Sequence, residues 1–147
     1  FARAAIRESY EEAAMLIGRS ASTPIVTSNT LWKPFLGHGQ LPDLAALRYV
    51  ARAVTPPGLV RRYDTRFFTV SRAAISAQLP DSPTNELSDL TWVPFDRVDQ
   101  FNIPRITGLI LQDVGERIVR EGTLDLSDNV AVPVYSMRYG KRRRVLV

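Results

Sequence analysis

The chain contains no cysteine and a single histidine among its 147 residues. Without cysteine it can form no disulfide bond and no thiolate zinc site within this sequence, and one histidine excludes a local site built from several imidazoles. Any metal ion bound by this segment must therefore be held mainly by oxygen ligands.

The sequence also lacks a long hydrophobic run. No apolar stretch approaches the roughly 20 residues that a membrane-spanning helix needs, and no charged segment followed by an apolar stretch indicates a signal peptide. We therefore expect a cytoplasmic protein with no membrane partner. The length and the composition, 45% hydrophobic and 23% charged, are those of one ordinary domain, residues 1–147, with enough apolar residues for a core.

Positive charge is in slight excess, with 19 Lys and Arg against 15 Asp and Glu. Much of this excess lies in the run Lys141 to Arg144, which near a terminus is typical of a solvated tail or turn. Nucleic-acid binding would require such charges to be joined to a groove or to aromatic platforms. The sequence shows neither clearly, so nucleic acid is not an expected partner.

Hydrophobic periodicity predicts a mixture of helices and strands. The clearest helix spans Pro104 to Gly122, because apolar residues recur there at helical spacing, Pro104 suits a first turn and Gly122 a helix end. Residues 31–40 are expected to form a connection with one short helix, and residues 43–54 a helix start that passes into a strand. The remaining expected elements are a helix over residues 2–17 and strands over residues 63–70, 87–93, 130–137 and 143–147.

The helix expected over residues 2–17 carries an acidic face. Glu8, Glu11 and Glu12 fall within an arc of roughly 100°, opposite an apolar side. Like charges at this spacing repel by roughly 0.2–0.5 kcal/mol per pair, whereas divalent magnesium or manganese would turn the cluster into a set of ligands. The alternative interpretation is an ordinary solvated helix face, on which Arg7 offsets Glu11 one turn away.

The arrangement REx2EE within AAIRESYEEAAMLIG resembles the second half of the Nudix box, the signature of the Nudix hydrolase family. Its charged positions are matched by Arg7, Glu8, Glu11 and Glu12. Two positions depart from the motif, since Ser9 stands where an aliphatic residue is usual and Ala14 replaces a glycine. Because the chain begins inside the motif, we expect its first half, the glycine loop and the opening strands of the sheet to lie upstream of Phe1.

Three later segments extend the resemblance over most of the chain. The strings ARAVTPPGLVRRYDTRFFTV, ELSDLTWVPFDRV and PRITGLILQDV are similar to parts of a bacterial Nudix group related to the coenzyme A diphosphatases. They resemble the strand pair after the box, the next strand with the start of a helix, and the closing helix. The resemblance implies an α/β fold, the Nudix-type α/β/α sandwich with a mixed β-sheet and the acidic helix packed on one face.

The resemblance further implies a metal-dependent hydrolase that cleaves a diphosphate linkage in a nucleoside diphosphate derivative, such as a nucleotide sugar, a dinucleotide or a coenzyme A ester. Mg2+ or Mn2+ would be the cofactor, held by Glu8, Glu11 and Glu12. Glu8, Glu11 and Arg7 would take part in catalysis, Glu11 as a ligand or by orienting the attacking water, and Arg7 by orienting a glutamate. Which carboxylate is the base stays open, and members of the family are often homodimers.

Four further sets of residues have two interpretations each. Glu86 is either another metal ligand or base, or an exposed loop residue. Arg66 either faces a phosphate or, as favoured here, joins an ion pair between neighbouring strands. His38, between two glycines, is expected in a surface loop. Several aromatic side chains could stack on a base, although core packing is the default expectation for them: Trp32, Phe35, Phe67 and Phe68.

A second function competes with the hydrolase: a Nudix-like nucleotide-binding or regulatory module that has lost its chemistry. The departures at Ser9 and Ala14 favour this module. Retention of all three glutamates favours the enzyme, because a binding module has no need to tolerate their mutual repulsion.

Overall fold

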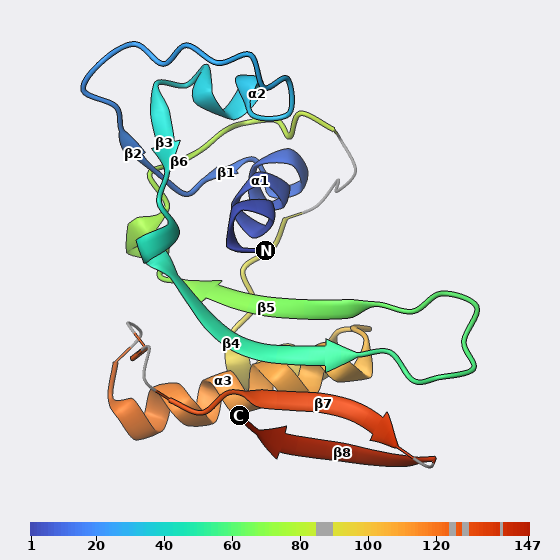
Figure 1. Ribbon diagram of the computed structural model, residues 1–147. Coiled ribbons are helices and arrows are strands. Elements are labelled where there is room, and N and C mark those ends of the chain that lie inside the picture. The colour runs from blue at the N-terminus through green and yellow to red at the C-terminus, as the bar shows by residue number, and fades with distance from the viewer. Residues whose placement is uncertain (85–89, 124–125, 128–129, 139) are drawn as a thin grey trace. The chain divides into compact units, whose positions relative to one another are not determined.

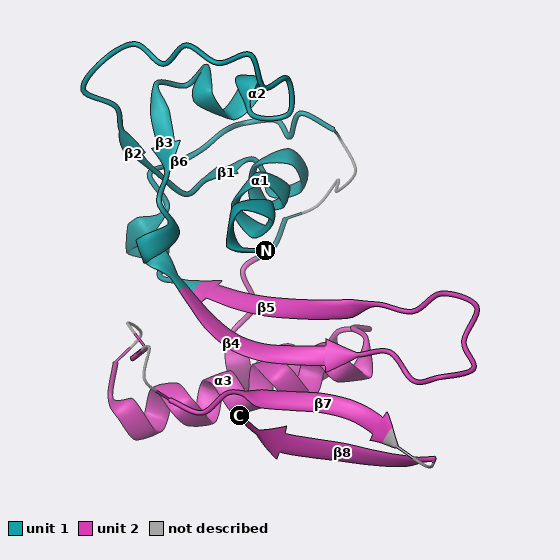
Figure 2. Cartoon of the chain, in the orientation of Figure 1, with its two compact units in different colours: residues 1–47, 70–91 teal, residues 48–69, 92–147 magenta. Residues whose placement is uncertain are grey.

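The computed structural model describes residues 1–84, 90–123, 126–127, 130–138 and 140–147. The chain divides into two compact units, which we call unit 1 and unit 2 (Figure 2). Unit 1 comprises residues 1–47 and 70–91, and unit 2 comprises residues 48–69 and 92–147. Each unit has its own hydrophobic core, although neither is a continuous piece of sequence.

Unit 1 contains the helix α1, Ala2–Ala13, and a second short helix, α2, Lys33–Leu36 (Figure 1). Its short strands are β1 Met15–Leu16, β2 Gly18–Ser20, β3 Gln40–Pro42 and β6 Ala77–Gln78, and its 3-10 turns are η1 Leu44–Ala46 and η2 Arg72–Ala74. The strand β1 pairs with β6, and β2 pairs with β3, both antiparallel. The buried side chains of its core are Ile6, Tyr10, Leu16, Ile17, Phe35 and Ile75. The helix α1 enters this core through two residues one turn apart, Ile6 and Tyr10.

The helix α1 ends at Ala13, whereas the sequence pattern predicted a helix through Ile17. Ala14 has φ 55° and ψ 23°, which is the left-handed conformation, and its N–H donates to the carbonyl oxygen of Tyr10 at 3.1 Å. The next two residues form β1. The prediction was wrong because a short apolar run fits a helical turn and a buried strand equally well, and alanine gives no signal for left-handed backbone.

Unit 2 contains a four-stranded sheet and the longest helix. Its elements are β4 Leu47–Val54, β5 Asp64–Val70, η3 Phe95–Gln100, α3 Arg105–Glu121, β7 Pro133–Arg138 and β8 Lys141–Leu146. The strand order is β5-β4-β7-β8, with β4 parallel to β7 and β7 antiparallel to β8. Figure 1 shows β5 running opposite to β4, so the sheet is mixed.

The helix α3 packs on one face of this sheet (Figure 1). The core between them is formed by Val50 and Ala51 of β4, Ile110 and Val114 of α3, and Leu126. The helix predicted from Pro104 to Gly122 is confirmed, since α3 begins directly after Pro104 and Gly122 ends it with φ 66°. Glycine reaches this left-handed conformation at no steric cost, which is why it so often follows the last helical turn.

Most expected strands are confirmed with small shifts at their ends. The segment 43–54 contains a 3-10 turn that passes into β4, and the strands expected over 63–70, 130–137 and 143–147 correspond to β5, β7 and β8. The short helix expected within residues 31–40 is α2. These elements establish a mixed α/β fold with one helix layer on the sheet of unit 2, and the complete α/β/α sandwich stays a prediction.

The strand expected over residues 87–93 is not confirmed. Residues 87–89 lie outside the described residues, and residues 90–93 belong to no strand. Leu90 and Trp92, which a strand over these residues would place on one face, are 44% and 61% exposed. The alternation was misleading because it marks a strand only where a neighbouring strand or a core covers one face.

Among the described residues, no helix combines the length and the apolar character that crossing a bilayer requires.

Candidate functional site

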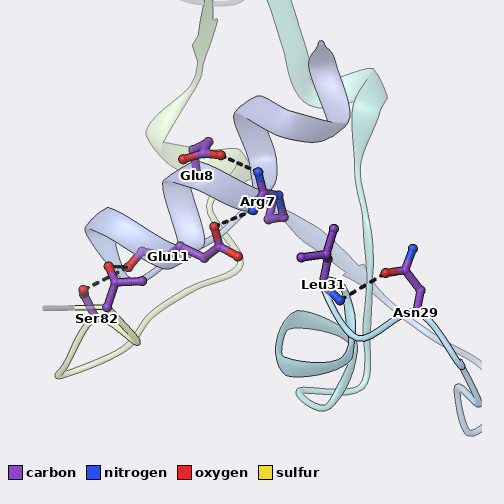
Figure 3. A network of polar contacts seen from close by, with 7 residues as sticks. Arg7, Glu8, Glu11, Asn29, Leu31 and Ser82 are labelled. Carbon is purple, nitrogen blue, oxygen red and sulfur yellow. Dashed lines mark hydrogen bonds and ion pairs between the residues drawn. The ribbon is translucent and has the colours of Figure 1, made fainter. Parts of the chain in front are cut away.

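The acidic face of α1 is organised by one arginine. Arg7 donates from Nη1 to Glu11 Oε2 at 2.8 Å, across one helical turn, and from Nη2 to Glu8 Oε1 at 2.5 Å. Figure 3 shows the Arg7 side chain between the two carboxylates. The pairs are partly open to water, because the side-chain exposure is 26% for Arg7, 47% for Glu8 and 23% for Glu11. Three of the four charged motif residues are therefore brought together on the helix surface.

The side of α1 opposite the acidic face is buried in the core of unit 1, and this burial leaves the acidic face on the surface of the helix. Ile6 is fully buried and Tyr10 is 5% exposed, and the Tyr10 ring meets the Phe35 ring edge to face with centroids 5.6 Å apart. The Tyr10 hydroxyl also lies 3.1 Å from His38 Nε2. Burial raises the pKa of the Tyr10 hydroxyl above its ordinary value, and the charge of Glu11 adds to the rise. His38 lies in the expected surface loop, and it is also bonded to α1.

A loop in the second stretch of unit 1, residues 70–91, forms hydrogen bonds with the last turn of α1. Ser82 Oγ and Thr84 Oγ1 both donate to the carbonyl oxygen of Glu11, at 2.9 and 2.8 Å. The end of a helix leaves its last carbonyls without intrahelical donors, and these hydroxyls supply the missing bonds. Figure 3 shows Ser82 against the backbone of Glu11. This loop brings residues more than 70 positions away to the acidic face.

The contacts of Ser82 and Thr84 with the Glu11 carbonyl were not predicted from the sequence, nor was the Tyr10–His38 hydrogen bond. The signal for Tyr10 was present, since it lies one turn after Ile6 and so shares the buried side of the helix. No local pattern marks the two hydroxyl residues, because their partner is a backbone carbonyl distant in sequence. Glu86, the other loop candidate, lies outside the described residues.

The donor set of α1 suits a hard cation chemically, because it consists of carboxylate oxygens alone. One oxygen of Glu8 and one of Glu11 are bonded to Arg7, and Glu12 is half-buried on the same helix. Within the described part of the chain, no three acidic or histidine side chains are grouped as a metal site. Magnesium would have to bind the second carboxylate oxygens of Glu8 and Glu11, which Arg7 does not contact.

Arg66 lies in unit 2, on β5, and faces a carboxylate of its own strand. Its Nη1 is 3.6 Å from Asp64 Oδ1, and Arg52 of β4 binds both Asp64 oxygens at 2.7 and 2.6 Å. The hydrogen bonds from Arg52 hold the pKa of the Asp64 carboxyl below its ordinary value. An ion pair between neighbouring strands is present, but Arg52 and Asp64 form it, and Arg66 adds a contact to Asp64 from the same strand. A phosphate-binding role for Arg66 stays a prediction.

The remaining aromatic candidates divide between the two units. Phe35 is fully buried in the core of unit 1, where Trp32 packs against it edge to face at 5.6 Å. Phe67 packs against the core of unit 2, and Phe68 lies beside Tyr49 with ring centroids 5.6 Å apart. Core packing, the default expectation, therefore describes Phe35 fully and the other three rings in part.

Comparison with models of protein families, with curated proteins and with solved structures finds no match for this chain.

Proposed function

We propose that this protein is a metal-dependent hydrolase of the Nudix type, which cleaves a diphosphate linkage in a nucleoside diphosphate derivative. The observation that carries the proposal is the backbone of Ala14. This residue stands where the motif has its glycine, and with φ 55° it adopts the conformation that glycine favours. The departure from the motif is thus a change of side chain with the backbone requirement kept.

The pairing of Arg7 gives a second support. The motif places an arginine directly before its first glutamate and four residues before another, and here Arg7 bonds to both Glu8 and Glu11. These contacts fix the rotamers of two carboxylates that would otherwise repel each other. These contacts support an orienting role for Arg7 in the proposed site.

In this proposal Glu8, Glu11 and Glu12 would hold Mg2+ or Mn2+. When bound, the ion supplies charge stabilisation for the phosphate oxygens and lowers the pKa of a bound water. Arg7 positions Glu8 and Glu11, and Glu11 accepts a hydrogen bond from the water that attacks phosphorus. Ser82 and Thr84 keep the last turn of α1 in place through the Glu11 carbonyl.

A binding module without chemistry is the second candidate, and one observation favours it. Within the described residues the glutamates form no group that could hold a metal, and Arg7 occupies two of them. A protein that only recognises a nucleotide could keep the same helix as a structural ion-pair cluster.

Phosphate release tests the proposal with the full chain and a panel of nucleotide sugars, dinucleotides and coenzyme A esters in the presence of Mg2+ or Mn2+. We expect turnover of at least one compound, and Glu12→Gln should abolish it. Glu116→Gln is the matched control, because Glu116 is an exposed carboxylate on α3 of the other unit. Its turnover should equal that of the wild type.

Binding of Mn2+ to the same variants separates the two candidates. Absence of turnover across the panel, with Mn2+ still bound or not, would overturn the hydrolase proposal. Nucleotide binding that survives Glu12→Gln and needs no metal would favour the module. Circular dichroism of each variant checks that the fold is retained.

A further inference from the structure

Unit 2 contains a pocket of about 360 Å3 between α3 and the sheet. It lies where β4 and β7 end, and Figure 1 shows the arrowheads of these two parallel strands at the same end of the sheet. The first turns of α3 close it through Arg105, Ile106 and Leu109. Small-molecule sites measure roughly 300–1,000 Å3, and in open α/β sheets they lie at the carboxyl ends of parallel strands.

The inner surface of this pocket is apolar. Phe67, Ile106, Leu109 and Met137 line it, and Phe67 and Ile106 also pack against the core of unit 2. Tyr135 also lines it, and the Tyr135 hydroxyl donates to Asp113. A ligand held there would place an apolar body against these side chains.

The rim of the pocket is basic. Arg105, Arg142 and Arg143 line it, and no acidic residue of the described part of the chain does so. Met137 is paired with Arg142 in the β7–β8 register, so both side chains lie on the same face of the sheet. Among the described residues these three arginines take part in no ion pair.

Nearby negative charge does not neutralise this rim. Asp113, two turns after Arg105 on α3, accepts hydrogen bonds from the Tyr135 hydroxyl and from Arg144 Nε, the latter at 3.1 Å. The N-terminal end of α3, a helix of 17 residues, adds positive potential to that of Arg105. Positive charge therefore surrounds the opening of an apolar pocket.

We propose that this pocket binds a small amphipathic anion, with an alkyl or aryl body inside and a phosphate or carboxylate head at Arg105 and Arg142. The arginines match such a head because their planar donors form paired hydrogen bonds to its oxygens. The site is built from unit 2 alone. It is thus independent of the hydrolase proposed for α1, and either can fail without the other.

Calorimetric titration of the full chain tests the proposal with four probes: n-octyl phosphate, octanoate, 1-octanol and inorganic phosphate. Both amphipathic anions should bind at least tenfold more tightly than 1-octanol or inorganic phosphate, because only they use the apolar wall and the rim together. The ratio between octyl phosphate and octanoate tells which head the rim prefers. Raising the salt concentration should weaken both anions and leave 1-octanol unchanged.

Two substitutions locate the binding. Arg142→Gln should weaken both anions about tenfold and leave 1-octanol unaffected, whereas Leu109→Trp should weaken all three apolar probes by filling the pocket. Arg97→Gln removes the same charge from η3, outside the pocket, and should change nothing. Thermal unfolding of each variant checks that unit 2 remains folded.

Four results would overturn the proposal. The first is equal affinity for 1-octanol and octyl phosphate, which would show that the pocket binds the alkyl chain and does not recognise the anionic head. The second is no saturable binding of either anion, and the third is an equal loss of affinity in Arg97→Gln and Arg142→Gln. If light scattering shows that Leu109→Trp breaks a dimer of the free chain, the pocket is an interface between copies and the ligand proposal also falls.

Discussion

Replacement of Ala14 by glycine tests the way in which α1 ends. If the helix continued through this residue, as the sequence pattern suggests, Ala14→Gly would be a substitution inside a helix and would cost about 1 kcal/mol. In the structure Ala14 has φ 55° and its N–H closes the last turn on Tyr10. Glycine at this position would relieve backbone strain, so the two descriptions predict different changes in the free energy of unfolding.

The magnitude follows from three contributions. A left-handed alanine is strained by roughly 1–2 kcal/mol relative to glycine. Against this gain, glycine loses the burial of one methyl group, worth about 0.8 kcal/mol, since Ala14 is 5% exposed. Glycine also adds about 0.4–1 kcal/mol of chain entropy to the unfolded state. The gain roughly offsets the two losses, so the free energy of unfolding of Ala14→Gly should stay close to that of the wild type. A glycine inside a helix would instead lose about 1 kcal/mol of helix propensity and about 0.8 kcal/mol of methyl burial together.

Ala5→Gly is the matched control, because Ala5 lies inside the same helix and its N–H donates to the Phe1 carbonyl at 2.9 Å. It should lose about 1 kcal/mol or slightly more. Urea unfolding followed by the fluorescence of Trp32, which packs against the core of unit 1, measures both variants. A loss in Ala14→Gly as large as that in Ala5→Gly would refute the left-handed end of α1.

Two further predictions concern the cores and the pH dependence of stability. Phe35→Ala should lose about 3–5 kcal/mol in urea unfolding, because Phe35 is fully buried between Tyr10 and Trp32; a loss under 1 kcal/mol would contradict its place in the core. Hydrogen bonds from Arg117 and Ser127 lower the pKa of Glu121 from 4.5 to about 2, so its contribution to stability is complete above pH 4.5 and disappears as the pH falls toward 2. Thermal unfolding between pH 2 and 5 should therefore have a shallower pH slope in Glu121→Gln than in the wild type, whereas the exposed control Glu116→Gln should keep the full slope.

Local signals sufficed for the elements whose ends are marked by special residues. Pro104 and Gly122 bracket α3, and the apolar spacing between them leaves one consistent buried side. The strand β5 was equally clear, because aromatic and β-branched residues fill it. Such elements are predictable since the physical cause lies within the element itself.

Other features depend on contacts that the local sequence does not contain. The left-handed end of α1 falls on an alanine, the best helix former, so only the pairing of β1 with β6 reveals it. The division into two units is equally hidden, because each unit draws on separate stretches of the chain.

The candidate site was predictable in part. Helical spacing placed Arg7 one turn from Glu11, and the structure confirms this contact, whereas spacing did not predict the bond from Arg7 to Glu8. Spacing could not show whether the carboxylates of Glu8 and Glu11 bind Arg7 or a metal ion, because this depends on their rotamers and on the presence of the ion. The pocket of unit 2 was missed altogether, since Arg105 and Arg142 meet only through the packing of α3 on the sheet.

The strand β8 has a consequence for how copies of this chain can associate. It is the last strand of the sheet order, and all six of its residues are exposed. An open edge of this kind is a template on which the strand of another molecule can align. A second copy approaching in this way would bring Lys141 to Arg144 against the same run of positive charges, and the repulsion would oppose the joining of the two sheets. The basic run therefore opposes pairing of this edge with the same edge of a second copy.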